Sequence, residues 1–263
     1  MLINANGIQI NYELSGQKDA SVVVLSHSLG SSMVMWNPQL EVLEPHFRVL
    51  RCDMRGHGDS QATEGNYTLD LLAADVIGLL DALKIDRVHF VGLSIGGMIG
   101  QCLAIHYPDR FKSLTLCDTS PVLPDDAKPL FQERMHLARA EGMRALVEGT
   151  LERWFTPSYR AQNHPAIDLI RNQFLATSVA GFNGCSAAIM ELNYLDRLAA
   201  IKLPTLIIVG EDDPGTPVEA SETIHGLIPN SKLVVLPSAA HLSNIEQAEA
   251  FNSAIMDYLL AQE

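Results

Sequence analysis

The chain has 263 residues and 47% hydrophobic content, which suits one α/β domain carrying an insertion and supplies ample side chains for a buried core. Its formal net charge of −13 argues against nucleic acid or an anionic membrane surface as a partner. No apolar run reaches the length of about 18 residues that indicates a membrane span. The four cysteines lack CxxC spacing, so we expect buried free thiols and a reducing, cytoplasmic location.

The predicted elements alternate between strands and helices through the first half of the chain. Residues 1–8 lack a basic signal-type segment and indicate a strand that enters a hairpin turn at Asn6-Gly7. Such alternation is typical of a mostly parallel sheet with helices on both faces. Strands are predicted at 22–25, 47–52, 88–91 and 113–117, and helices at 68–83 and 95–107.

The alternation stops between about 121 and 200, where no convincing strand occurs. We therefore expect an α/β core made of 1–120 and 201–263, with 121–200 inserted as a helical cap over the carboxyl-terminal edge of the sheet. In the insertion, helices are predicted at 131–140, 143–154, 167–177 and 182–192, and two more strands follow it at 205–209 and 233–236.

The most informative motif is Gly92-Leu93-Ser94-Ile95-Gly96, which fits the G-x-S-x-G nucleophile elbow. A predicted strand precedes it and a predicted helix follows it, which is the context that the motif requires. The serine then sits in a strained turn at the positive end of a helix, and glycines on both sides let neighbouring backbones pass closely. We interpret Ser94 as a nucleophile; the alternative is a structural Ser-Gly turn.

A nucleophilic serine needs a base, and the base needs a group that orients it. Sites of this kind follow the chain order serine, acid, histidine. Among nine histidines, only His241 has this order and lies in a loop after a late strand, so we predict it as the general base. His57 lies in the glycine-rich loop 53–60, and we interpret it as loop structure.

The acid is open among three residues that follow predicted strands. Asp213 is favoured, but Asp212 is adjacent to it and only one of the two can orient the imidazole. Asp118, after the strand at 113–117, is the third candidate.

The oxyanion hole of such a site takes two backbone N–H groups. One is expected from Ile95, the residue after the serine. The other is expected from Leu29, in the loop 27–30 that follows the strand at 22–25, where Gly30 lets the loop bend back. The alternative is that 27–30 forms only a turn.

These residues resemble those of an α/β-hydrolase-fold enzyme over nearly the full chain, and more closely those of the 3-oxoadipate enol-lactonases of the β-ketoadipate pathway. The loop and elbow motifs occur throughout the superfamily, whereas 153–156 and 241–247 are more specific to the enol-lactonases. The family's acid falls at the fourth position of the turn 210–213, which favours Asp213. The matching stretches are 27–30, 35–40, 46–51, 53–60, 92–101, 152–157 and 240–247.

The resemblance implies a serine hydrolase that opens a small anionic enol-lactone through an acyl-enzyme, with Ser94, His241 and Asp213 as the triad. Its partner would be a small-molecule lactone or ester, and neither a metal nor another cofactor is expected. A general carboxylesterase or a carbon–carbon bond hydrolase on the same triad is the first alternative. A ligand receptor of the same fold is the alternative outside catalysis, and slow or single turnover would mark it.

Three residues are candidates for substrate contact. Arg134 matches the arginine at the start of the family's cap, with Phe131 where the family usually carries a tryptophan. Trp36 follows the oxyanion loop, and Trp154 lies in the cap. The alternatives are core packing for the tryptophans and a solvated ion pair for the arginine.

Overall fold

The chain opens with the predicted hairpin in the computed structural model, which describes residues 1–263. Asn6 and Gly7 turn the chain with φ angles of 45° and 79°, the left-handed conformations that a two-residue hairpin turn needs. β1 (Leu2–Ala5) pairs antiparallel with β2 (Ile8–Gly16), which in turn pairs antiparallel with β4 (Arg48–Cys52).

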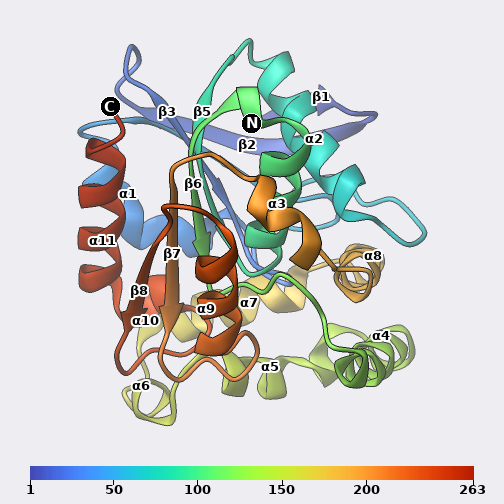
Figure 1. The fold of residues 1–263 in the computed structure, drawn as a ribbon. Coiled ribbons are helices and arrows are strands. Elements are labelled where there is room, and N and C mark those ends of the chain that lie inside the picture. Colours follow the sequence, from blue (N-terminus) through green and yellow to red (C-terminus); the bar gives the residue numbers. More distant parts are fainter.

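All eight strands belong to one sheet in the order β1-β2-β4-β3-β5-β6-β7-β8, and the pairs from β4 to β8 are parallel (Figure 1). Its central strands are buried along their whole length, which explains why they read as continuous apolar runs. The remaining strands are β3 (Val22–Ser26), β5 (Val88–Leu93), β6 (Phe111–Cys117), β7 (Thr205–Gly210) and β8 (Lys232–Leu236).

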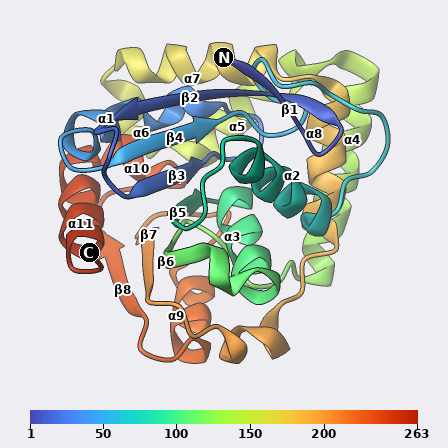
Figure 2. The same cartoon turned by 90° about the horizontal axis from the view of Figure 1, so that it is seen from above.

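Helices cover both faces of the sheet, as the alternating pattern predicts (Figure 2). One face carries α1 (Asn37–Leu43) and α11 (Ala248–Leu260), which pack on each other. The other face carries α2 (Leu69–Ala82), α3 (Ile95–His106) and α9 (Val218–Leu227). Short helices complete this part of the fold: η1 (Met33–Trp36), η2 (Pro108–Arg110), η5 (Leu195–Ala200) and α10 (Ser243–Glu246).

The segment between β6 and β7 contains helices and one isolated bridge between Val122 and Asn193, but no strand. Apart from η5, Figure 1 shows these helices gathered beyond the end of the sheet toward which β6 points. They are η3 (Asp125–Ala127), α4 (Lys128–Glu141), η4 (Met143–Ala145), α5 (Val147–Trp154), α6 (Pro157–Ala161), α7 (Pro165–Ala176) and α8 (Val179–Met190).

Several details of this segment differ from the sequence prediction: α6 was not predicted, and α4 begins three residues before the predicted start. The predicted helix 143–154 is divided into η4 and α5, and α8 begins three residues before the predicted start because the hydroxyl of Ser178 caps it by accepting the N–H of Gly181. All four cysteines are buried free thiols, as predicted. No helix combines the length and the apolar composition that crossing a membrane requires.

Candidate active site

The nucleophile elbow forms where β5 ends and α3 begins. Ser94 has φ 59° and ψ −119°, a left-handed conformation that is strained for a residue with a side chain. A Cβ on Gly92 would lie 2.2 Å from the carbonyl oxygen of Gly96, and a Cβ on Gly96 would lie 2.4 Å from that of Ser26. The hydroxyl of Thr119 donates to the Ser94 carbonyl oxygen at 2.8 Å. The strand, turn and helix predicted around Ser94 are therefore present, and the glycines are sterically required.

His241 and Asp213, which follow β8 and β7, are joined by a hydrogen bond of 2.7 Å between Nδ1 and Oδ2. Asp213 also accepts the N–H of Gly215 at 2.8 Å and the hydroxyl of Thr216 at 2.6 Å. Burial would raise the pKa of the Asp213 carboxyl, but the His241 charge and these hydrogen bonds outweigh burial and lower it. Burial would lower the pKa of His241, but the charge and hydrogen bond of Asp213 raise it overall. Asp213 thus stays ionised and orients the imidazole.

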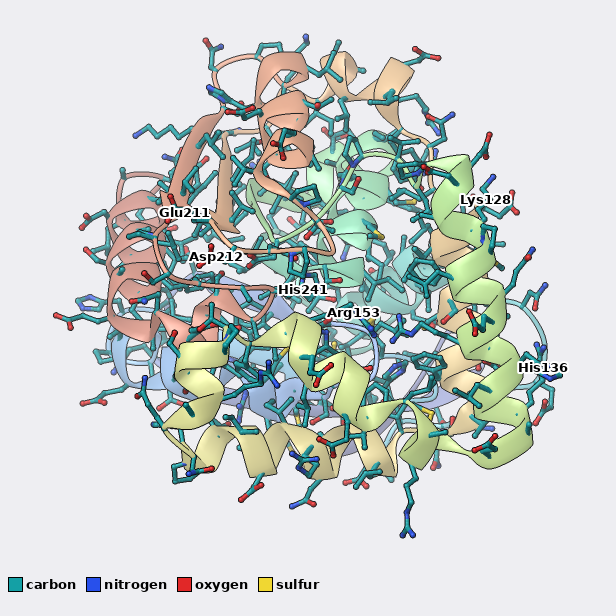
Figure 3. The ribbon with its side chains drawn as sticks, turned by 90° about the horizontal axis from the view of Figure 1, so that it is seen from below. Lys128, His136, Arg153, Glu211, Asp212 and His241 are labelled. Atoms are coloured by element: carbon teal, nitrogen blue, oxygen red, sulfur yellow. The ribbon has the colours of Figure 1, made fainter.

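The other two candidate acids lie elsewhere. Asp212 is exposed, and Figure 3 shows it away from His241. Asp118 is fully buried, but its carboxylate accepts the N–H of Gly210 at 2.8 Å and the hydroxyl of Ser243 at 2.6 Å. Burial first, and then the charge of Asp213, raises the pKa of Asp118 well above its usual value. The geometry therefore selects Asp213 as the partner of His241.

Leu29 and Ile95 occupy the places expected for oxyanion donors. Ile95 is the first residue of α3, where backbone N–H groups lack helical partners. The N–H of Ser28 donates to Met35 Sδ at 3.3 Å and that of Gly30 to His57 Nε2 at 2.9 Å, whereas the N–H of Leu29 between them has no acceptor in the chain. A free N–H at the edge of a cavity is available to a ligand oxygen.

Ser94 and His241 open into one cavity of about 480 Å³, within the range of small-molecule sites. Leu29, Arg134 and Trp154 line it as well, so the structure brings most of the predicted site residues together. Its wall is otherwise largely apolar and comes mainly from the segment between β6 and β7: Val122, Leu123, Leu130, Phe131, Ile189 and Leu192.

Two arginines at this cavity have no carboxylate partner. Arg134 Nη2 and Arg153 Nη2 each donate to the hydroxyl oxygen of Thr150 at 3.3 Å. The hydroxyl itself donates its proton to a backbone carbonyl oxygen of the same helix turn. The Arg134 guanidinium lies 5.3 Å from the ring centre of Phe182, and its Nε is shielded from solvent without a partner. Burial, and then the charge of Arg153, lowers the pKa of Arg134 to about 9. The surface ion pair considered for Arg134 is absent.

Arg153 was not predicted as a site residue, although it stands in the family-specific stretch 153–156. Figure 3 shows it near His241, whereas Lys128 and His136 point outward from α4. Thr150 and Arg153 are three residues apart on α5, so they share one helix face. The sequence could have predicted that Thr150 and Arg153 share a helix face. It could not have predicted that both lie close to Arg134, because that depends on how α4 and α5 are placed in the fold.

The two tryptophans have different positions. Trp154 lines the cavity and packs edge-to-face on Phe174 with ring centres 5.7 Å apart. The structure does not place Trp36 where substrate contact was predicted: its side chain is fully buried, packs on Phe251 and does not line the cavity. Phe251 belongs to α11, so Trp36 packs on the helix layer that covers this face of the sheet.

One cluster away from the cavity has possible metal ligands. Donor atoms of Asp70, Cys102 and His106 lie within 4.8 Å of one another. His106 Nε2 is also 2.7 Å from a guanidinium nitrogen of Arg197, whose positive charge opposes a cation there. Burial raises the pKa of the Cys102 thiol to about 12, which further disfavours the thiolate that a metal needs.

Comparison with known proteins agrees with this geometry. Residues 21–248 match the model of the alpha/beta hydrolase fold family. The chain is 34% identical over 253 residues to 3-oxoadipate enol-lactonase 2 of Acinetobacter baylyi, which covers 96% of this chain and 94% of that protein. The enol-lactonase structure from Burkholderia xenovorans LB400 superposes with a TM-score of 0.96 at 37% identity, covering 99% of this chain and 100% of that one. A thermophilic esterase from Thermogutta terrifontis superposes with a TM-score of 0.93 at 32% identity, covering 100% and 99%. The chain therefore belongs to the α/β hydrolase family.

Proposed function

We propose that this protein is a serine hydrolase that opens 3-oxoadipate enol-lactone to 3-oxoadipate. The observation that carries the proposal is a pair of guanidinium groups without a carboxylate partner, Arg134 and Arg153, at the cavity that holds Ser94 and His241. A positive charge withdrawn from water without a counter-ion is costly, and a substrate carboxylate would relieve that cost. The enol-lactone carries such a carboxylate beside its scissile ester.

In the proposed mechanism, Ser94 Oγ attacks the lactone carbonyl carbon while His241 Nε2 accepts the serine proton. The carbonyl electron pair moves to the oxygen, which the N–H groups of Leu29 and Ile95 stabilise. The ring C–O bond then breaks, and His241 returns its proton to the leaving enol oxygen. Asp213 holds Nδ1 of the imidazole and stabilises its charged form throughout.

The leaving group of a lactone stays tethered to the acyl-enzyme, so it competes with water for the acyl carbon. An enol leaving group escapes this competition because it tautomerises to a ketone, which is no longer a nucleophile. Water activated by His241 then attacks the acyl carbon, and Ser94 leaves with the proton that His241 returns. The product has two carboxylates and a ketone.

A matched pair of substrates tests the proposal: the enol-lactone and the methyl ester of its carboxylate. Both have the same ring and leaving group, but only the first has the charge. We expect kcat/KM to be at least about 30-fold higher for the acid, the lower end of the range for a buried charge partner. Equal values, or faster hydrolysis of the methyl ester, would contradict the assignment of an anionic substrate.

A general carboxylesterase is the second candidate function. The apolar part of the cavity wall, with Leu123, Leu130 and Ile189, supports it, as does the similarity to the thermophilic esterase. An esterase of this kind would prefer neutral alkyl esters such as p-nitrophenyl butyrate over the anionic lactone, so adding this ester to the same assay separates the two functions.

The proposal also covers the roles of the two parts of the chain, the pathway of the reaction and the cellular location of the enzyme. Residues 121–200 act as the cap of the active site, and 1–120 with 201–263 form the hydrolase core. The proposed reaction would belong to the β-ketoadipate pathway of aromatic compound catabolism, and the similarity to the 3-oxoadipate enol-lactonases supports this. Four free thiols support a reducing cytoplasmic location.

A further inference from the structure

Two histidines, one in the oxyanion loop and one in the loop next to it, have no part in the mechanism above. His27 and His57 are both fully buried, and their ring centres lie 5.4 Å apart. They come from two neighbouring loops, 27–30 after β3 and 53–60 after β4. The sequence suggested only loop structure for His57, yet its side chain is wholly enclosed.

The two imidazoles connect these loops reciprocally. His27 Nδ1 lies 2.8 Å from the carbonyl oxygen of Ser28 in its own loop, and its Nε2 accepts the N–H of Met54 in the other loop at 2.9 Å. His57 Nδ1 lies 3.1 Å from the carbonyl oxygen of Arg55 in its own loop, and its Nε2 accepts the N–H of Gly30 across the gap at 2.9 Å.

Each ring therefore has one defined protonation pattern. Nε2 accepts a backbone N–H in both rings, so Nδ1 carries the proton and donates to a backbone carbonyl. Burial is the main reason that the pKa is lowered to about 4 for His27 and to about 3 for His57, which keeps both rings neutral and able to accept.

These bonds fix the two peptide planes that flank the oxyanion donor. The carbonyl of Ser28 and the N–H of Leu29 belong to one trans peptide unit, so holding the carbonyl in one direction points the N–H in the opposite direction. His27 holds that carbonyl, and the N–H of Ser31 also donates to it at 3.1 Å. His57 holds the next peptide plane through Gly30.

The loop that bears His57 is itself anchored. Asp53 accepts the N–H groups of Met33 at 2.8 Å and Asp59 at 3.0 Å, which closes the loop around its carboxylate. The hydroxyl of Ser178, at the start of α8, donates to the carbonyl of Gly56 at 2.9 Å. His57 thus connects the oxyanion loop to the loop 53–60, which is held in place by Asp53 and by Ser178 of the segment between β6 and β7.

We propose that His27 and His57 are positioning residues that aim the N–H of Leu29 at the substrate oxyanion. They touch neither substrate nor Ser94; they act by holding the peptide planes on both sides of the donor. The inference rests on the proposed serine mechanism, in which Leu29 is an oxyanion donor.

Amide substitutions test this because asparagine and glutamine mimic different halves of a histidine. The amide of asparagine reaches the place of Nδ1, and that of glutamine reaches the place of Nε2. At position 57 the bond to Gly30 uses Nε2, so His57→Gln keeps it and His57→Asn loses it. At position 27 the bond to Ser28 uses Nδ1, so His27→Asn keeps it and His27→Gln loses it.

The expected result is an opposite order of rescue at the two positions. His57→Asn and His27→Gln should lose about 100-fold in kcat on p-nitrophenyl acetate with little change in KM, the size of effect seen when one oxyanion donor is removed. His57→Gln and His27→Asn should each stay at least tenfold more active than the other variant at that position. Affinity for an alkylboronic acid, which forms a tetrahedral adduct on serine, should fall in parallel with kcat.

His89→Asn is the matched control, because His89 is an equally buried histidine that contacts Ser113 and Glu263 instead. It should lower the melting temperature and leave kcat near that of the wild type. The same order of rescue at both positions, or four variants that lose thermal stability but keep kcat, would overturn the proposal. Ser94→Ala is assayed alongside: activity in that variant refutes the mechanism itself, whereas an inactive Ser94→Ala with the wrong rescue order refutes only the positioning role.

Discussion

Replacing Arg134 with methionine should separate charged from neutral substrates. Methionine keeps much of the apolar length of the side chain and removes the guanidinium, together with its contacts over the rings of Phe131 and Phe182. The substrate carboxylate would then lose a largely desolvated charge partner, which costs about 2–5 kcal/mol. At about 1.4 kcal/mol for each factor of ten, kcat/KM for the enol-lactone should fall by about 30-fold to 4,000-fold. Long-range attraction cannot replace the lost contact, because the chain carries a net charge of −13.

Steady-state kinetics on the enol-lactone and on p-nitrophenyl acetate measure the effect. The neutral ester should lose less than about tenfold, since it has no carboxylate to hold. Arg139→Met is the matched control, because Arg139 lies exposed on the same helix α4. Equal losses on both substrates in Arg134→Met would refute the reasoning and show that Arg134 supports the structure of the segment between β6 and β7.

Three further predictions concern the same site. Asp213→Asn should cost about 10⁴ in kcat by leaving His241 in the wrong tautomer, while Asp212→Asn should be mild; reversed effects would mean that the acid is misassigned. The kcat/KM of the wild type should fall as the pH drops through the raised pKa of His241, because the base must be neutral. In Asp213→Asn this acid limb should move to lower pH, because burial lowers the pKa of His241 and the charge of Asp213 no longer opposes it. An acid limb that does not move would contradict the Asp213–His241 coupling. Arg153→Met should raise KM for the enol-lactone by about tenfold or more and change KM for p-nitrophenyl acetate little, and unchanged KM for both would remove Arg153 from the anion site.

The elbow and the sheet could be predicted from the sequence because both depend on local patterns. Gly92 is required by contacts within the elbow, with Gly96 and Gly97, and Gly96 is required by the approach of Ser26 and His27, but both glycines belong to one short motif that can be recognised locally. Continuous apolar runs marked the central strands because helices cover them on both faces. The Asn6-Gly7 turn was recognisable for the same local reason, since both residues tolerate positive φ.

The rest of the site depends on contacts between distant segments. Asp212 and Asp213 are adjacent in sequence, and only the path of the chain after β7 decides which one reaches His241. His57 was interpreted as loop structure because its partner, Gly30, is 27 residues away. For Trp36, an aromatic residue beside the oxyanion loop can face the cavity or the core, and its packing on Phe251 is not encoded locally.

The most direct test of the proposed function is kcat/KM for 3-oxoadipate enol-lactone with the wild type and Ser94→Ala, measured by loss of the lactone and formation of 3-oxoadipate. We predict that the wild type hydrolyses the lactone with a higher kcat/KM than p-nitrophenyl acetate. We predict that Ser94→Ala folds normally by circular dichroism and loses about 10⁴ or more in kcat. A wild type that prefers the neutral ester, or a Ser94→Ala variant that keeps more than about a tenth of the activity, would contradict it.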